Sequence, residues 1–224
     1  MPSHQELMAL GKKALGAGDA KAAIGALRSA LEQKPEDPNT LLLLAQALER
    51  DEQLPQAQKA WLWCASRVRS PTMPLQRALA ISLRRKNVEA THKLLSSITR
   101  EYPALLTFKA QLARLELARG QVDACLELAL ALIDDALAAN DVLHQAEGNL
   151  VAGLAFLLGS KPTYAEKHLM QARELKPDAV EPWLALASLR AHKKDRARAE
   201  QILSEAVRRF RRSSARRTTS RCSI

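Results

Sequence analysis

The chain has 224 residues, of which 47% are hydrophobic and 4% aromatic, and its formal net charge is +10. Alanine and leucine are frequent and glycine is scarce, which disfavours sheets and favours closely packed helices. We therefore expect an all-α fold. The longest apolar run, Asn149 to Gly159, is too short to cross a bilayer, so no membrane span is expected.

The N-terminus reads as a helix rather than a targeting segment. Ser3 and Glu6 have the spacing of a helix capping box, and the segment "MPSHQELMALGKK" has no apolar core of signal-peptide length. Cys64, Cys125 and Cys222 form no CxxC pair, which fits a reducing compartment. We expect a cytoplasmic protein in which Cys64 and Cys125 are small buried thiols on helices.

A pattern of large and small apolar residues recurs along the chain. If His4 is position 1, positions 4, 7, 8, 20, 24 and 27 hold Leu7, Leu10, Gly11, Ala23, Leu27 and Ala30, and Pro35 follows. A shift of 34 residues gives Leu41, Leu44, Ala45, Ala57, Trp61 and Cys64. A third unit reads Leu75, Ala78, Leu79, Ala90, Leu94 and Ser97, and it requires one deletion in its "RRKN" turn.

The second half of the chain repeats the pattern with one irregularity. The fourth, fifth and sixth units are marked by Ala113 and Cys125, by Gly153 and Ala165, and by Ala187 and Ala199. The step from the fourth unit to the fifth is 40 residues rather than 34. It indicates either a lengthened second helix, with a break and a new helix cap near Asn140 and Asp141, or an indifferent loop insertion.

A helix–turn–helix unit of 34 residues with these positions resembles the tetratricopeptide repeat. The resemblance covers about residues 4 to 210 and implies an α-solenoid, a right-handed superhelix of about six units, at 4–37, 38–71, 72–104, 106–139, 146–179 and 180–210. Small residues are expected at positions 8, 20 and 27, where two helix backbones approach closely.

The resemblance also implies a concave groove for partners, lined by positions 2, 5, 9, 12 and 13 of each first helix. It assigns to the polar half Lys12, Gln46, Arg50, Arg77 and Arg84, and to the apolar half Leu150, Leu154, Leu184 and Ser188. The alternative for these leucines is packing within a helix buried on both sides. The family's two-carboxylate clamp is not expected, because only Arg77 matches its lysine, asparagine and arginine positions.

Catalysis is not expected. The five histidines stand on different helices, and the sequence contains no metal-ligand spacing, phosphate loop or nucleophile elbow. We expect a scaffold or adaptor without catalytic residue, metal or cofactor that binds a protein or peptide. The alternative is the repeat portion of a larger bacterial-type enzyme, such as a sulfotransferase, hydroxylase or phosphodiesterase, truncated near residue 210.

The repeat pattern stops after Phe210. Residues 211–224 are rich in Arg, Ser and Thr, so we expect a disordered tail. The basic residues of this end include Arg208, Arg209, Arg211, Arg212, Arg216 and Arg217. Three explanations stay open: a weak, non-specific arm for nucleic acid or anionic lipid, a phosphorylatable arm, and the truncated or frame-shifted end of a longer protein.

Overall fold

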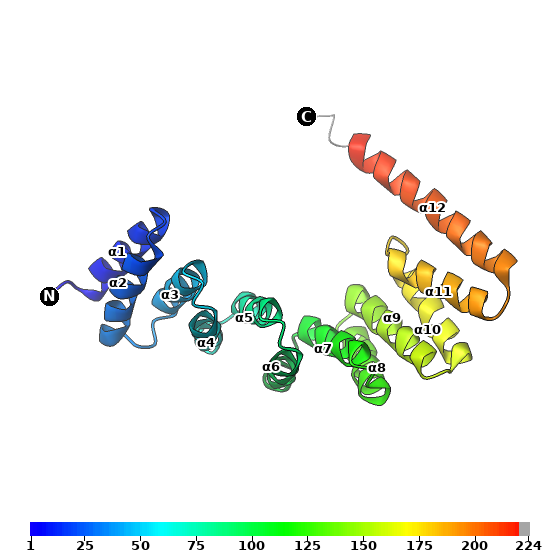
Figure 1. Cartoon of the computed structure of the whole chain (residues 1–224), viewed down its shortest axis with the longest axis horizontal. Coiled ribbons are helices and arrows are strands. Elements are labelled where there is room, and N and C mark those ends of the chain that lie inside the picture. The colour runs from blue at the N-terminus through cyan, green and yellow to red at the C-terminus, as the bar shows by residue number, and fades with distance from the viewer. Residues whose placement is uncertain (220–224) are drawn as a thin grey trace. The chain divides into compact units, whose positions relative to one another are not determined.

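The computed structural model describes the backbone of residues 1–219, which form twelve helices and the turns between them (Figure 1). The first helices of the six pairs are α1 (His4–Gly16), α3 (Pro38–Arg50), α5 (Thr72–Arg84), α7 (Leu106–Ala118), α9 (Val142–Leu158) and α11 (Val180–His192). The second helices are α2 (Ala20–Gln33), α4 (Leu54–Ala65), α6 (Val88–Glu101), α8 (Val122–Ala138), α10 (Pro162–Leu175) and α12 (Arg196–Thr219). The expected all-α fold of six helix pairs is confirmed.

The helices belong to two compact units, Met1–Ile98 and the part of the chain from Thr99 onward. In the first unit α1 packs on α2, α2 on α3, α3 on α4 and α4 on α5. In the second unit α7 to α12 pack in the same sequential order, and α9 also contacts α7 and α11. Within each unit, packed helix pairs therefore cover apolar faces of one another, as a repeat that cannot bury that face alone requires.

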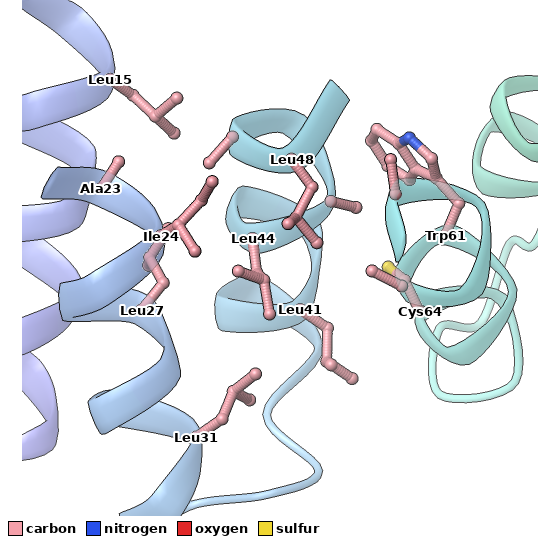
Figure 2. Close-up of a cluster of buried hydrophobic side chains, with 14 of the residues drawn as sticks. Leu15, Ala23, Ile24, Leu27, Leu31, Leu41, Leu44, Leu48, Trp61 and Cys64 are labelled. Carbon is pink, nitrogen blue, oxygen red and sulfur yellow. The ribbon is translucent and has the colours of Figure 1, made fainter. Parts of the chain in front are cut away.

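Leucines of neighbouring helices form the core of the first unit. Figure 2 shows Ile24 of α2 directed at α3, while Trp61 and Cys64 of α4 approach α3 from its other side. Leu41 of α3 is fully buried between them. The expected capping box at the start of α1 is confirmed, since Ser3 accepts from the Glu6 amide and Glu6 accepts from the Ser3 amide.

In the first and fifth repeats position 8 is a glycine, and the leucine at position 24 lies directly over it. A Cβ on Gly11 would stand 2.5 Å from Cγ of Leu27, and a Cβ on Gly153 would stand 2.7 Å from Cγ of Leu169. The expectation of a close approach is correct, and the atoms that meet there are a backbone and a leucine side chain. In these two repeats the contact sets the distance between the two helices.

The third repeat contains no deletion, which corrects the expected register. The buried residues of α6 are Thr91, Leu95 and Ile98, whereas Ser97 is exposed. These residues hold positions 20, 24 and 27 of an unbroken 34-residue unit. The wrong register arose because Ala90 has the small size expected at position 20. Thr91 fills that position instead, and its hydroxyl oxygen lies 2.9 Å from that of buried Ser82 on α5.

The irregular step between the fourth and fifth repeats is helical. Helix α9 has 17 residues, whereas the other first helices have 13. Helix α8 also has 17 residues, whereas the earlier second helices have 12 or 14. Asp141 caps α9 by accepting from the amides of Leu143 and His144, and Asn140 before it has φ 52°. The predicted lengthened helix and break are therefore confirmed, and the loop-insertion alternative is wrong.

The segment after Phe210 differs from the expected disordered tail. Helix α12 continues through Thr219, and residues 220–224 lie outside the part that the structure describes. Alanine and arginine are strong helix formers, so a helix already anchored on α11 through Ala199 and Ala206 can continue through them. Leu203, at position 24 of this repeat, is 40% exposed.

The turn inside every repeat uses a left-handed backbone at position 15. The φ angles there are 83° at Gly18, 57° at Glu52, 52° at Lys86, 72° at Gly120, 55° at Ser160 and 61° at Lys194. Glycine adopts this conformation without steric cost, whereas other residues lose about 1–2 kcal/mol. Two of the six turns are therefore relaxed and four are strained.

The same substitution should have opposite effects at two glycines. Gly120→Ala should lower the free energy of unfolding by about 1 kcal/mol, because it places a Cβ on a left-handed residue. Gly25→Ala should raise it by about 0.5–1 kcal/mol, because Gly25 lies in the exposed middle of α2. Neither new Cβ meets an atom within 4 Å. Urea unfolding measures both, and equal signs would contradict the role given to position 15.

A methyl group at position 8 should be costly. Gly153→Ala should lower the free energy of unfolding by about 1–3 kcal/mol, because the new Cβ overlaps Leu169. In the double variant Gly153→Ala, Leu169→Ala that overlap is absent, so the two losses should be clearly less than additive. Additive losses in urea unfolding would show that the two positions do not share this contact.

Candidate functional site

The first unit contains a polar hollow of about 380 Å³. Its lining residues come from α3, α4 and α5: Gln46, Glu49, Arg50, Trp61, Arg77 and Arg84. Four of the five polar groove residues predicted from sequence are thus brought together. The fifth, Lys12, is exposed on α1 and does not line the hollow.

Partners within the first unit already engage the arginines of the polar hollow. Arg50 donates to the carbonyl of Leu15 at 2.6 Å, Arg77 lies 3.6 Å from Glu49, and Arg84 donates to Glu52 at 2.9 Å. Glu49 also accepts from the indole of Trp61 at 3.0 Å. This network fixes the positions of the side chains and balances most of their charge. The arginines are therefore held by groups of the protein and are not free to bind an anion.

The second unit contains a larger groove of about 670 Å³, which is mainly apolar. Leu117 of α7, Leu154, Leu157 and Leu158 of α9, and Leu189 of α11 supply its apolar surface. Ser160, Pro162, Ser188 and His192 complete the lining. We call this surface the leucine groove. It lies along the first helices, which is where the repeat pattern predicts a partner surface.

Sequence reasoning located part of the leucine groove. Leu154 and Ser188 line it as predicted, but Leu150 is only 3% exposed and packs with Leu169 and Leu186, so its assignment as a partner contact is corrected. The packing alternative holds at this residue because α11 covers position 5 of α9. Leu184 has the same position on α11 and is 52% exposed, yet it does not line the groove.

The leucines that the prediction missed follow the family's positions. Leu117 and Leu157 stand at position 12 of their repeats, and Leu158 and His192 stand at position 13. These positions were available from the repeat register alone. Reading all of them in the fourth and fifth repeats would have found the groove.

One arginine joins the three first helices of the second unit. Arg114 of α7 donates to Glu147 of α9 and, at 3.2 Å, to Glu181 of α11. The carboxylates raise the pKa of Arg114, and Arg114 lowers the pKa of Glu181 below its ordinary value. Glu147 and Glu181 hold position 2 and Arg114 holds position 9, so all three occupy expected groove positions. They fix the spacing of the helices that form the leucine groove.

The described arginines of the C-terminal helix lie at its surface. Arg208, Arg209 and Arg211 are exposed, and Arg209 lies 3.5 Å from Asp178. The side chains of Arg212, Arg216 and Arg217 lie outside the described part. An anion-binding role for this end of the chain therefore stays a prediction.

The two described cysteines are free thiols inside the helix pairs. Burial raises the pKa of Cys64, and burial together with Glu116 raises the pKa of Cys125 to about 11. Both thus behave as small apolar residues, as expected. Among the described residues, no cluster of three or more His, Cys, Asp or Glu side chains could hold a metal ion. No helix in residues 1–219 combines the length and apolar character that crossing a membrane requires.

The bridge through Arg114 should contribute a pH-dependent stability. Glu181→Gln should lower the free energy of unfolding at neutral pH by less than about 1 kcal/mol, since the pair is partly exposed. The pKa of Glu181 is lowered in the folded chain, so the contribution is complete above its unfolded pKa and is lost as the pH falls through the folded value. Urea unfolding at neutral and acid pH should show the difference vanish in acid. Glu174→Gln on α10 is the control and should change nothing, and a difference that persists in acid would contradict the assignment.

Comparison with known proteins agrees with this architecture. Residues 14–60 match the model of a tetratricopeptide repeat family. A search of curated proteins finds no significant relative. None of the matches points to an enzyme family, and tetratricopeptide repeat domains are typically non-catalytic and generally mediate protein interactions.

Solved structures share the fold at low sequence identity. A tetratricopeptide repeat protein from Parabacteroides merdae has 15% identity and a TM-score of 0.59, with 91% of this chain and 78% of that chain covered. YrrB, a tetratricopeptide repeat protein with an unusual peptide-binding site, has 12% identity and a TM-score of 0.55, with 79% and 88% covered. Yeast Tom70 has 13% identity and a TM-score of 0.59, and this chain covers 48% of its length. Residues 14–60 are therefore similar to a tetratricopeptide repeat, and the six helix pairs share the fold of solved tetratricopeptide repeat structures.

Proposed function

We propose that this chain is a non-enzymatic interaction protein that binds a peptide or helix of a protein partner in the leucine groove. The observation that carries the proposal is the open apolar surface itself. Leu158 is 58% exposed beside Leu154 and Leu157, and the groove volume of about 670 Å³ falls within the range of ligand sites.

Energetics favour an occupant with apolar side chains. Each square ångström of apolar surface that a partner covers contributes about 25 cal/mol, before the cost of association is subtracted. A contiguous apolar groove with a few polar residues at its margin is typical of surfaces that bind an amphipathic segment. Ser188 and His192 supply such polar groups here.

The polar hollow of the first unit has a secondary place in this proposal. Arg50, Arg77 and Arg84 have partners inside the unit, so a ligand would have to compete with Leu15, Glu49 and Glu52 for them. Gln46 and Lys12 carry no such competing contact within residues 1–211, whose side chains the structure describes, and would supply polar contacts. We place the interaction in the cytoplasm, a proposal that the free thiols of Cys64 and Cys125 support.

Two matched variants test the proposal. A phage-displayed library of short random peptides is selected on the full chain, and the enriched peptides are measured by fluorescence anisotropy. Leu158→Glu should weaken their binding at least about tenfold, because it places a charge in the apolar groove. Leu184→Glu should leave binding unchanged, because Leu184 is similarly exposed on α11 but lies outside the groove.

Circular dichroism serves as the folding control for both variants, and both substituted side chains are exposed in the native chain. If selection yields no peptide whose binding Leu158→Glu weakens, the leucine groove is not the partner site. Equal losses for both variants would count against the proposal in the same way.

A further inference from the structure

The margin of the leucine groove carries an excess of positive charge on one side. The turn Ser160–Lys161–Pro162 between α9 and α10 contributes two lining residues and places Lys161 between them. His192, at the end of α11, also lines the groove and is followed by Lys193 and Lys194. These two turns belong to consecutive repeats, so their cations border the same end of the groove.

Two acidic side chains near this margin, Glu166 and Glu116, already have basic partners. Glu166 accepts from Arg190 and, at 3.0 Å, from Lys193. Glu116 is buried and lies 3.3 Å from Arg119 at the end of α7. By contrast, the ammonium groups of Lys161 and Lys194 have no ion pair or hydrogen bond with any side chain that the structure describes. The two lysines are therefore available to a ligand, while Asp195, which follows Lys194, accepts from the backbone amide of Arg198 at the start of α12.

The opposite end of the same helices has the reverse character. Arg114 is held there by two carboxylates, Glu147 and Glu181, so the formal charge of that cluster is negative. The leucine groove thus runs from a closed acidic cluster to an open basic margin. The difference in charge between the two ends can orient a segment that binds along the groove, because complementary charge selects partners and fixes their orientation.

We infer that the leucine groove selects acidic amphipathic segments: apolar anchors occupy the surface of Leu117, Leu154, Leu157 and Leu158, and an adjacent Asp or Glu pairs with Lys161 and Lys194. The inference rests on the proposed function and adds the chemistry of the partner. Acidic residues near the anchors are attracted to the basic margin, whereas basic residues there are repelled. The two lysines are exposed, so their contribution is to selectivity and association rate more than to total affinity.

The peptides enriched on the full chain test the inference. Those whose binding Leu158→Glu abolishes should contain Asp or Glu beside their apolar residues more often than the unselected library. The double variant Lys161→Glu, Lys194→Glu should weaken their binding by about fivefold or more and reduce its salt dependence. Lys167→Glu is the control for charge reversal, because Lys167 is exposed on the outer helix α10 and does not line the groove.

Each outcome decides one of the two proposals. Groove-dependent peptides with neutral or basic flanks, or acidic peptides that the lysine double variant binds equally well, would overturn the inference and leave the proposed function standing. A loss of the same size in Lys167→Glu would also overturn it, because net charge alone would then explain binding. The absence of any peptide sensitive to Leu158→Glu would overturn the proposed function itself.

Discussion

In the first and fifth repeats, the contact between position 8 of the first helix and position 24 of the second helix sets the distance between the two helices. Where position 8 is glycine, the leucine at position 24 lies so close that even one added carbon would overlap it. Only one separation of the two helices satisfies this contact, because a packed core does not deform continuously. The other small residues, such as Ala23 and Ala165, then bury completely at position 20.

The surface available to a partner follows from this contact. Residues at positions 8, 20, 24 and 27 pack the helices against one another. The face of each first helix that remains for a partner therefore carries positions 9, 12 and 13. In α3 these positions hold Gln46, Glu49 and Arg50, of which Glu49 bonds to Trp61 and Arg50 bonds to Leu15. In α9 they hold Leu154, Leu157 and Leu158, which line the leucine groove and are partly buried or exposed. One architecture thus gives a closed polar hollow and an open apolar groove, depending on which residues occupy three positions.

The sequence predicted the helix pairs because the repeat period and the residue sizes agree in copy after copy. The prediction was wrong where a residue fits the repeat pattern by its size or its position but has a different environment in the structure. Ala90 is small enough for position 20, but Thr91 holds that position because Ser82 can bond its hydroxyl. Leu150 stands at a groove position, yet its exposure depends on whether α11 covers it, and that is a property of the neighbouring repeat. The bridge formed by Arg114 joins residues up to 67 apart in the sequence, and side-chain spacing within one repeat carries no signal for it.

The lengthened α8 and α9 bear on the same groove. The additional turn of α9 begins at Asp141, which caps the helix and lies 2.6 Å from Nδ1 of His144, while Nε2 of that ring lies 3.1 Å from the hydroxyl of Thr107 on α7. At a second level along the same helices, Arg114 ties α7 to α9 and α11. The helix that supplies Leu154, Leu157 and Leu158 is therefore held to α7 at two points. A groove whose walls are fixed in this way pays little ordering entropy when a segment enters it, and that entropy is one of the main costs that weaken binding to flexible surfaces. The additional turn that the irregular step adds to α9 therefore helps to hold these three leucines in fixed positions.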